Sequence, residues 1–183
     1  MPRNKSIADE ALLERCRLTF LAKGIGVSTR ELAKSVGVSE ATLFARFKTK
    51  DELFFLAMRL PSPDLSKALA EARSMEAEAG LIVLASAALA YLRAQMPALL
   101  LVLSHPDYLA RSRPAATLMN AREVGTPFRA LIAEKASHPD PDTSAQLLVS
   151  ALITRALHEA VGVMTPARST AWLTRTVHAL TQE

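Results

Sequence analysis

The sequence predicts an all-α protein made of an amino-terminal three-helix unit and a larger helical remainder. Alanine and leucine are abundant and runs of β-branched residues are few, which favours helices over strands. Half of the 183 residues are hydrophobic, so the chain can bury a sizeable core. The clearest break is the proline pair Pro61 and Pro63, and we expect separate domains over residues 1–60 and 61–183.

The positive charge of the chain is concentrated in its first third. The formal net charge is +4. Residues 1–60 contain 11 Lys and Arg against 7 Asp and Glu, whereas residues 61–183 contain 11 of each sign. Such an asymmetry indicates a module that faces a polyanion, joined to a neutral one.

Cysteine content and apolar runs exclude several classes of protein. Cys16 is the single cysteine, which excludes a disulfide framework and a thiolate zinc site, and we expect it to be an inert core thiol. Arg93 and Pro97 interrupt the most apolar stretch, so we expect no membrane span. The amino terminus is polar and no signal-peptide run follows it, so the expected location is the cytoplasm.

Capping signals mark the first two helices. A helix is expected over residues 6–23, where Gly24 stops it. The next helix begins after Ser28, because Ser28 and Glu31 have the spacing of a capping box.

A glycine turn then predicts a helix-turn-helix. Gly37 lies between two short helices and is flanked by valines, which is the pattern of that motif. Ser39 is the expected cap of the third helix, over residues 40–47. Thr49 and Glu52 form a second capping box, which opens a fourth helix.

Prolines divide the rest of the chain into further helices, and Pro127 is expected to kink or break one of them. These helices are expected over residues 64–73, 76–95, 97–103, 114–137, 143–163 and 169–180.

The third helix is the expected recognition helix for double-stranded DNA. Thr42 can bond a phosphate or a base edge, and Arg46 can bind guanine or rest on the backbone. Glu40 has three open interpretations: an acceptor for cytosine, a group that repels wrong sequences, or a carboxylate that complements the helix dipole. The expected DNA-binding residues are Thr29, Arg30, Ser39, Glu40, Ala41, Thr42, Phe44, Ala45, Arg46, Lys48 and Lys50.

The run from Gly37 to Leu53 resembles a known family. It reads Gly-Val-Ser-Glu-Ala-Thr-Leu-Phe-Ala-Arg-Phe-Lys-Thr-Lys-Asp-Glu-Leu. This is similar to the pattern G-V-S-x-x-T-L-Y-x-H-F-x-x-K-x-x-L of the TetR family of transcriptional regulators. Phe44 stands where tyrosine is frequent, which removes a hydroxyl that bonds phosphate, and Arg46 stands in place of a histidine or tyrosine.

The resemblance implies a homodimeric regulator, with a helical domain for ligand sensing and dimerisation after the DNA-binding domain. We expect a repressor of a palindromic operator, released by a small apolar effector. The expected ligand pocket consists of Met58, Leu84, Ala88, Tyr91, His105, Tyr108, Asn120, Val124, Phe128 and His158. The expected dimer interface consists of Leu147, Ala151, Thr154, His158, Trp172, Leu173, Thr176, Val177 and Leu180.

Two other functions remain open at this stage. One is a DNA-binding dimer without an effector, controlled by abundance or by a partner protein. The other is a helical enzyme with a vestigial DNA-binding head. His105 and His138 each have an aspartate two residues later, but both pairs lie in proline turns where aspartate commonly bonds its own backbone. We therefore expect no catalytic residues, no metal and no cofactor.

Overall fold

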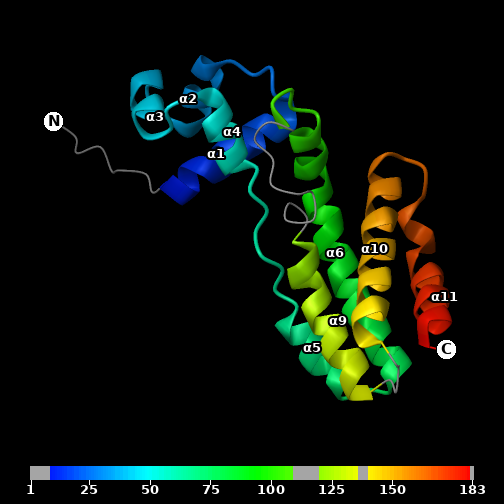
Figure 1. Cartoon of the computed structure of the whole chain (residues 1–183). Coiled ribbons are helices and arrows are strands. Elements are labelled where there is room, and N and C mark those ends of the chain that lie inside the picture. The colour runs from blue at the N-terminus through cyan, green and yellow to red at the C-terminus, as the bar shows by residue number, and fades with distance from the viewer. Residues whose placement is uncertain (1–8, 109–119, 136–139, 182–183) are drawn as a thin grey trace. The chain divides into compact units, whose positions relative to one another are not determined.

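The computed structural model describes residues 9–108, 120–135 and 140–181, which are helical and contain no strand. The prediction of an all-α protein is confirmed (Figure 1). The described helices are α1 (Asp9–Lys23), α2 (Thr29–Val36), α3 (Glu40–Arg46), α4 (Lys50–Ala57), α5 (Ser66–Arg73), α6 (Ala77–Leu103), α9 (Ala121–Lys135), α10 (Pro141–Ala160), the 3-10 helix η1 (Pro166–Arg168) and α11 (Ser169–Thr181).

The described residues divide into two compact units. One contains residues 9–59 and 98–108, and the other contains residues 60–97, 120–135 and 140–181. The boundary therefore passes through α6 at Pro97. Residues 98–108 were expected with the second domain, but in the structure they belong with α1–α4. His105 helps to attach this segment to the first unit, because its ring stacks on Phe54 of α4 with the ring centroids 4.9 Å apart.

The first unit is held together by one apolar stripe on α1. Leu12, Cys16 and Phe20 recur at helical spacing and are fully buried. Phe20 meets Phe54 of α4 edge to face, with the ring centroids 5.1 Å apart. Burial raises the pKa of the Cys16 thiol to about 11, so the thiol is protonated and poorly nucleophilic at neutral pH.

Short-range hydrogen bonds define α2 and its turn, as the sequence predicts. The Glu31 amide donates to Ser28 Oγ and the Ser28 amide donates to Glu31 Oε2, both at 3.2 Å, which completes the capping box. Gly37 ends α2 with φ +83°, a left-handed conformation that glycine adopts without strain. The following α3 makes the helix-turn-helix complete.

Helix α6 differs from the prediction, because the two helices expected over residues 76–95 and 97–103 are one 27-residue helix, Ala77–Leu103. Pro97 lacks the amide hydrogen that would bond one turn back, which costs about 3 kcal/mol in a helix interior. Met96, Ala98 and Leu99 are buried on both sides of the proline, and their packing offsets that cost.

Length and composition alone would allow α6 to cross a membrane. In the structure its middle is part of a protein core, because Leu84, Ala88 and Leu92 are buried.

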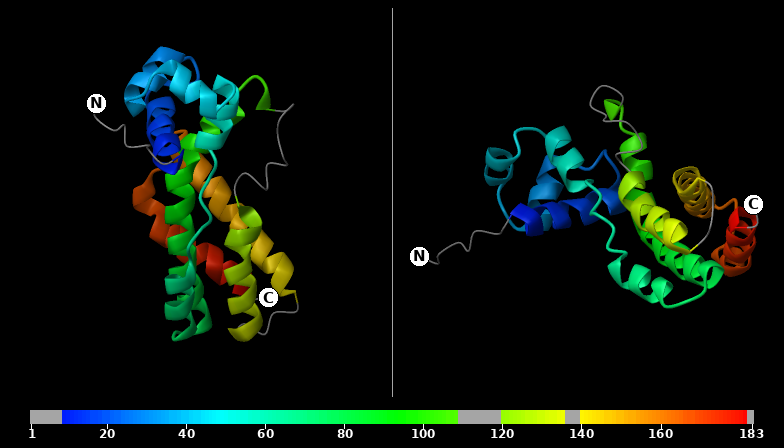
Figure 2. Two further views of the ribbon diagram at one scale, coloured as in Figure 1. Left: turned by 90° about the vertical axis from the view of Figure 1, so that its left-hand side faces the viewer. Right: turned by 60° about the horizontal axis from the view of Figure 1, so that its bottom comes forward.

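Helices α9 and α10 pack side by side in the second unit (Figure 2). Pro127 lies inside the continuous α9, where the sequence predicts a kink or a break. Helix α10 begins two residues earlier than expected. Asp140 caps it by accepting the Thr143 amide at 3.0 Å, and Pro141 occupies its first turn without needing an amide hydrogen.

A buried charge network joins α6, α10 and α11. Glu159 accepts hydrogen bonds from Arg93 Nε at 2.5 Å, Arg155 Nε at 2.6 Å and Ser169 Oγ at 2.8 Å. Arg155 also lies over the ring of Trp172, 5.5 Å from its centroid. The bond from Arg93, helped by Ser169 and Arg155 and opposed by burial, lowers the pKa of Glu159 to about 2.

Candidate functional site

Helix α3 has one buried side and one exposed side. Leu43 is fully buried and Phe47, just after the helix, is also buried, so both anchor the helix to the first unit. None of the expected DNA-binding residues is buried: Thr29, Phe44 and Lys50 are half-buried, and Arg30, Ser39, Glu40, Ala41, Thr42, Ala45, Arg46 and Lys48 are exposed. The structure thus gathers the expected residues of α2, α3 and the start of α4 on the surface of one unit.

The amino-terminal ends of α2 and α3 are linked by side chains. Thr29 Oγ1 donates a hydrogen bond to Glu40 Oε2 at 2.6 Å. Ser39 Oγ accepts the Thr42 amide at 3.1 Å and lies 2.8 Å from Thr42 Oγ1. The bond from Thr29 restricts the side chain of Glu40, and the contact with Ser39 Oγ restricts that of Thr42. Both exposed side chains are therefore preorganised.

Basic side chains lie at the end of α3 and the start of α4. Arg46 Nη1 donates to Asp9 Oδ1 of α1 at 2.9 Å. Lys48 and Lys50 flank Thr49, whose Oγ1 caps α4 by accepting the Glu52 amide at 3.0 Å. Cationic side chains beside a capped helix start are suited to phosphate groups, because they add point charge to the positive end of the helix dipole.

His105 was expected in the ligand pocket, but it lies against α4 in the first unit. Its side chain is only 4% exposed and contacts the rings of Phe54 and Phe55, at centroid distances of 4.9 and 4.8 Å. The Asp107 amide donates to Nδ1 at 3.1 Å, and Nε2 lies 3.6 Å from Asp51 Oδ1. The bond to Nδ1 comes from the backbone amide of Asp107 and differs from the expected bond of an aspartate to its own backbone, and nothing in the sequence shows the packing on α4.

The other expected pocket residues are divided between the two units of the structure. Met58 and Tyr108 lie in the first unit, and Leu84, Ala88, Val124 and Phe128 are buried core residues of the second. Tyr91 Oη donates to the Pro61 carbonyl at 2.7 Å, and Asn120 Nδ2 donates to both of these oxygens at 2.9 Å. Tyr91 and Asn120 therefore hold the segment after α4. His158 is half-buried on α10.

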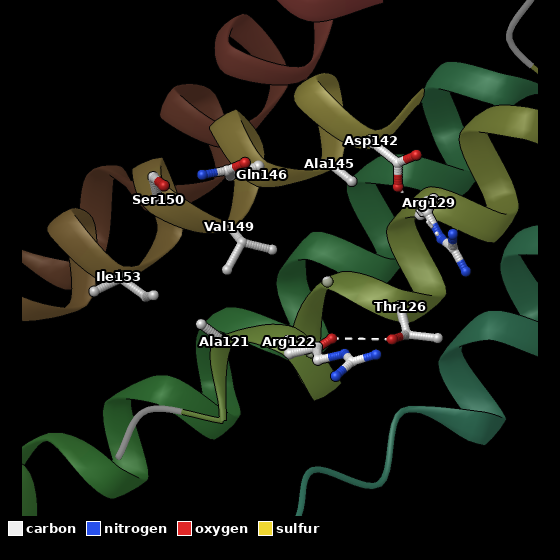
Figure 3. A pocket seen from close by; sticks show the side chains of 11 residues that line it. Ala121, Arg122, Thr126, Arg129, Asp142, Ala145, Gln146, Val149, Ser150 and Ile153 are labelled. Carbon is white, nitrogen blue, oxygen red and sulfur yellow. Dashed lines mark hydrogen bonds and ion pairs between the residues drawn. The ribbon is translucent and has the colours of Figure 1, made fainter. Parts of the chain in front are cut away.

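A cavity of about 680 Å³ lies between α9 and α10 (Figure 3). From α9 it is lined by Ala121, Arg122, Gly125, Thr126 and Arg129. From α10 it is lined by Asp142, Ala145, Gln146, Val149, Ser150 and Ile153. None of the ten expected pocket residues is among them.

The comparisons with known proteins decide the class of the first unit. Residues 12–57 match the sequence model of the bacterial regulatory proteins of the tetR family. The amino-terminal domain is a tetR-family domain. This range contains the capped helices α2 and α3, with the exposed surface described above.

Solved structures of transcriptional regulators share the fold over nearly the whole chain. A protein from Mesorhizobium loti assigned to this family has a TM-score of 0.71 at 20% identity, covering 95% of this chain and 93% of that one. A transcriptional regulator from Rhodococcus sp. RHA1 has a TM-score of 0.69 at 24% identity, covering 96% and 97%. The regulator FadR from Bacillus subtilis, solved with stearoyl-CoA, has a TM-score of 0.62 at 10% identity, covering 95% and 98%.

The residues expected at a dimer interface lie outside the tetR-family domain, on α10 and α11. On α10, Leu147 is 53% exposed, Thr154 is exposed, and Ala151 and His158 are half-buried. On α11, Leu173 and Val177 are buried within the chain itself, whereas Trp172, Thr176 and Leu180 are half-buried. Leu173 and Val177 are therefore covered by their own chain, and the other expected interface residues remain at least partly accessible to a second copy.

Proposed function

We propose that this protein is a sequence-specific DNA-binding regulator of transcription that acts as a homodimeric repressor. The observation that carries the proposal is the exposed, preorganised surface of α3 in a tetR-family domain. Thr42 and Arg46 face outward where a recognition helix reads base edges, and Lys48 follows for phosphate.

Symmetry supports a dimer on a palindromic operator. A helix of seven residues such as α3 covers only a few base pairs, so two copies are needed to specify a genomic site. The exposed Leu147 and the half-buried Ala151, one turn further along α10, offer an apolar contact for a second copy. Two recognition helices would then fit DNA only when their separation matches about one helical turn.

A ligand that favours another separation would release the operator by population shift. The stearoyl-CoA complex of FadR from Bacillus subtilis supports this, since it shows that one regulator of this fold binds a small molecule. In this proposal the protein is a regulator in the cytoplasm, associated with the bacterial nucleoid while it is bound to DNA. It is not an enzyme.

Binding to a DNA duplex over a salt titration tests the assigned surface. The variant Arg46→Ala/Lys48→Ala should bind more weakly, and the slope of log K against log salt should fall by about 1 for each phosphate that the variant no longer neutralises. The variant Lys67→Ala/Arg175→Ala removes the same charge from exposed sites on α5 and α11 and should keep the original slope. Equal slopes for the two variants would place the DNA-binding surface elsewhere.

A further inference from the structure

We propose that the cavity between α9 and α10 binds an organic carboxylate that carries an apolar body. The site differs from the pocket predicted from the sequence in both position and lining. Its shape, floor and charge each point to the same class of ligand.

Small residues form part of the floor of the space between the two helices. Gly125 of α9 faces Val149 of α10, and a Cβ on Gly125 would lie 3.8 Å from Val149 Cγ2. Ala145 and Val149 are buried and form an apolar floor, which Ile153 extends along α10. Figure 3 shows Val149 extending from α10 into the space between the helices. Such a floor favours a hydrocarbon or aromatic body over a fully hydrated ion.

The charge of the lining favours an anion. Two guanidinium groups, Arg122 and Arg129, extend from α9, and Asp142 of α10 is the one carboxylate in the lining. Arg129 Nε and Asp142 Oδ1 are 3.6 Å apart and both side chains are largely exposed, so this pair is loose.

Arg122 is the preferred anchor for the carboxylate. Over the part of the chain that the structure describes, no carboxylate forms an ion pair with Arg122. The lining therefore has one uncompensated positive charge, held on a planar group that matches a carboxylate with two parallel hydrogen bonds. Gln146 and Ser150, exposed on the α10 side, supply further hydrogen-bonding groups. A cavity of about 680 Å³ lies within the range of small-molecule sites.

The cavity and the expected dimer interface use different residues of α10. The lining uses Asp142, Ala145, Gln146, Val149, Ser150 and Ile153. None of these is among the α10 residues expected to contact a second copy, although Gln146, Ser150 and Ile153 each precede one of them in the sequence. The inference deepens the proposed ligand-responsive function, but binding in the cavity is measured without DNA.

Titration calorimetry of the full-length protein with three matched probes tests the inference. The probes are biphenyl-4-carboxylate, the neutral biphenyl-4-carboxamide and the cationic biphenyl-4-methylamine, which share one apolar body. The carboxylate should bind with one site per chain and roughly tenfold more tightly than the amide. The amine should bind most weakly. Equal affinities for acid and amide, or no binding of the acid, would overturn the proposal.

Three variants locate the site. Arg122→Gln removes the charge but keeps a polar, unbranched side chain, and it should reduce the affinity for the carboxylate about tenfold, to that of the amide. Gly125→Leu fills the cavity and should abolish the binding of both probes. Arg175→Gln makes the same charge change on an exposed residue of α11 and should leave the affinity unchanged. Circular dichroism shows that each variant is folded, and unchanged binding in a folded Gly125→Leu would also overturn the proposal.

Discussion

Arg46 of α3 donates a hydrogen bond from Nη1 to Asp9 Oδ1 of α1, at 2.9 Å. The arginine that is expected to meet DNA is thus held by a carboxylate of its own chain. Because Asp9 is 67% exposed, the pair is worth at most about 1 kcal/mol and can be exchanged for a phosphate or a base.

Asp9→Asn should therefore strengthen DNA binding. Removing the carboxylate deletes one bond of the Arg46 guanidinium and a negative charge close to the expected DNA-binding residues. We expect about two- to fivefold tighter binding at low salt, with the gain shrinking as salt rises. Fluorescence anisotropy of a labelled duplex measures this. Glu10→Gln removes one negative charge at the next position and is the matched control; a gain of the same size there would show a general charge effect.

The bond between Thr29 and Glu40 should determine sequence discrimination. Glu40→Gln removes a carboxylate that repels phosphate, so binding to a scrambled duplex should become a few times tighter. Thr29→Val keeps the charge but removes the 2.6 Å bond that holds Glu40, so discrimination should fall while binding to the scrambled duplex stays the same. Competition between selected and scrambled duplexes reads out both effects. If Thr29→Val discriminates as well as the original protein, the bond has no part in readout.

The cap of α3 should be a local determinant of stability. Ser39→Ala removes the bond to the Thr42 amide and should lower the free energy of unfolding by about 1 kcal/mol. Ser35→Ala is the matched control inside α2, where alanine is the better helix former. Chemical denaturation followed by circular dichroism measures the free energy of unfolding of both variants. If Ser39→Ala were as stable as Ser35→Ala, the cap would have no role in stability.

The network around Glu159 should make the protein sensitive to acid. The pKa of Glu159 is lowered from 4.5 to about 2 in the folded protein, chiefly by the hydrogen bond from Arg93. Its stabilising contribution is therefore fully present above about pH 4.5 and is lost as the pH falls towards 2. Thermal unfolding from pH 7 to pH 2 measures this loss.

Glu159→Gln should flatten that acid-dependent part of the stability curve. It leaves Arg93 and Arg155 without their carboxylate, so it should cost about 3 kcal/mol at pH 7. Glu71→Gln, an exposed change on α5, should leave the curve as it is. If Glu159→Gln lost stability between pH 4.5 and pH 2 as the original protein does, other groups would govern unfolding in acid.

Signals within a few residues predicted helices α2, α3 and α4 of the first unit well. Ser28, Gly37, Ser39 and Thr49 act through bonds to neighbours in the chain, so their spacing alone places α2, α3 and α4. The exposed residues of α3 follow from the same periodicity, since Leu43 and Phe47 fix which side is buried.

Features that depend on distant packing could not be predicted in this way. The continuity of α6 through Pro97 results from burial of its neighbours, which outweighs the local preference to stop. His105 joins α4 through aromatic contacts between residues far apart in the sequence, and no local pattern encodes them. The cavity between α9 and α10 depends on small residues on two helices, such as Gly125 and Ala145, which in the sequence resemble ordinary core positions.

Selection from a random pool of DNA duplexes tests the central claim most directly. The full-length protein should enrich a palindromic sequence whose half-sites are separated by about one helical turn, as two symmetry-related α3 helices require. The variant Arg46→Ala/Lys48→Ala should enrich that sequence weakly or not at all, while Lys67→Ala/Arg175→Ala should enrich it as the original protein does. Recovery of a pool without any shared sequence would contradict the account.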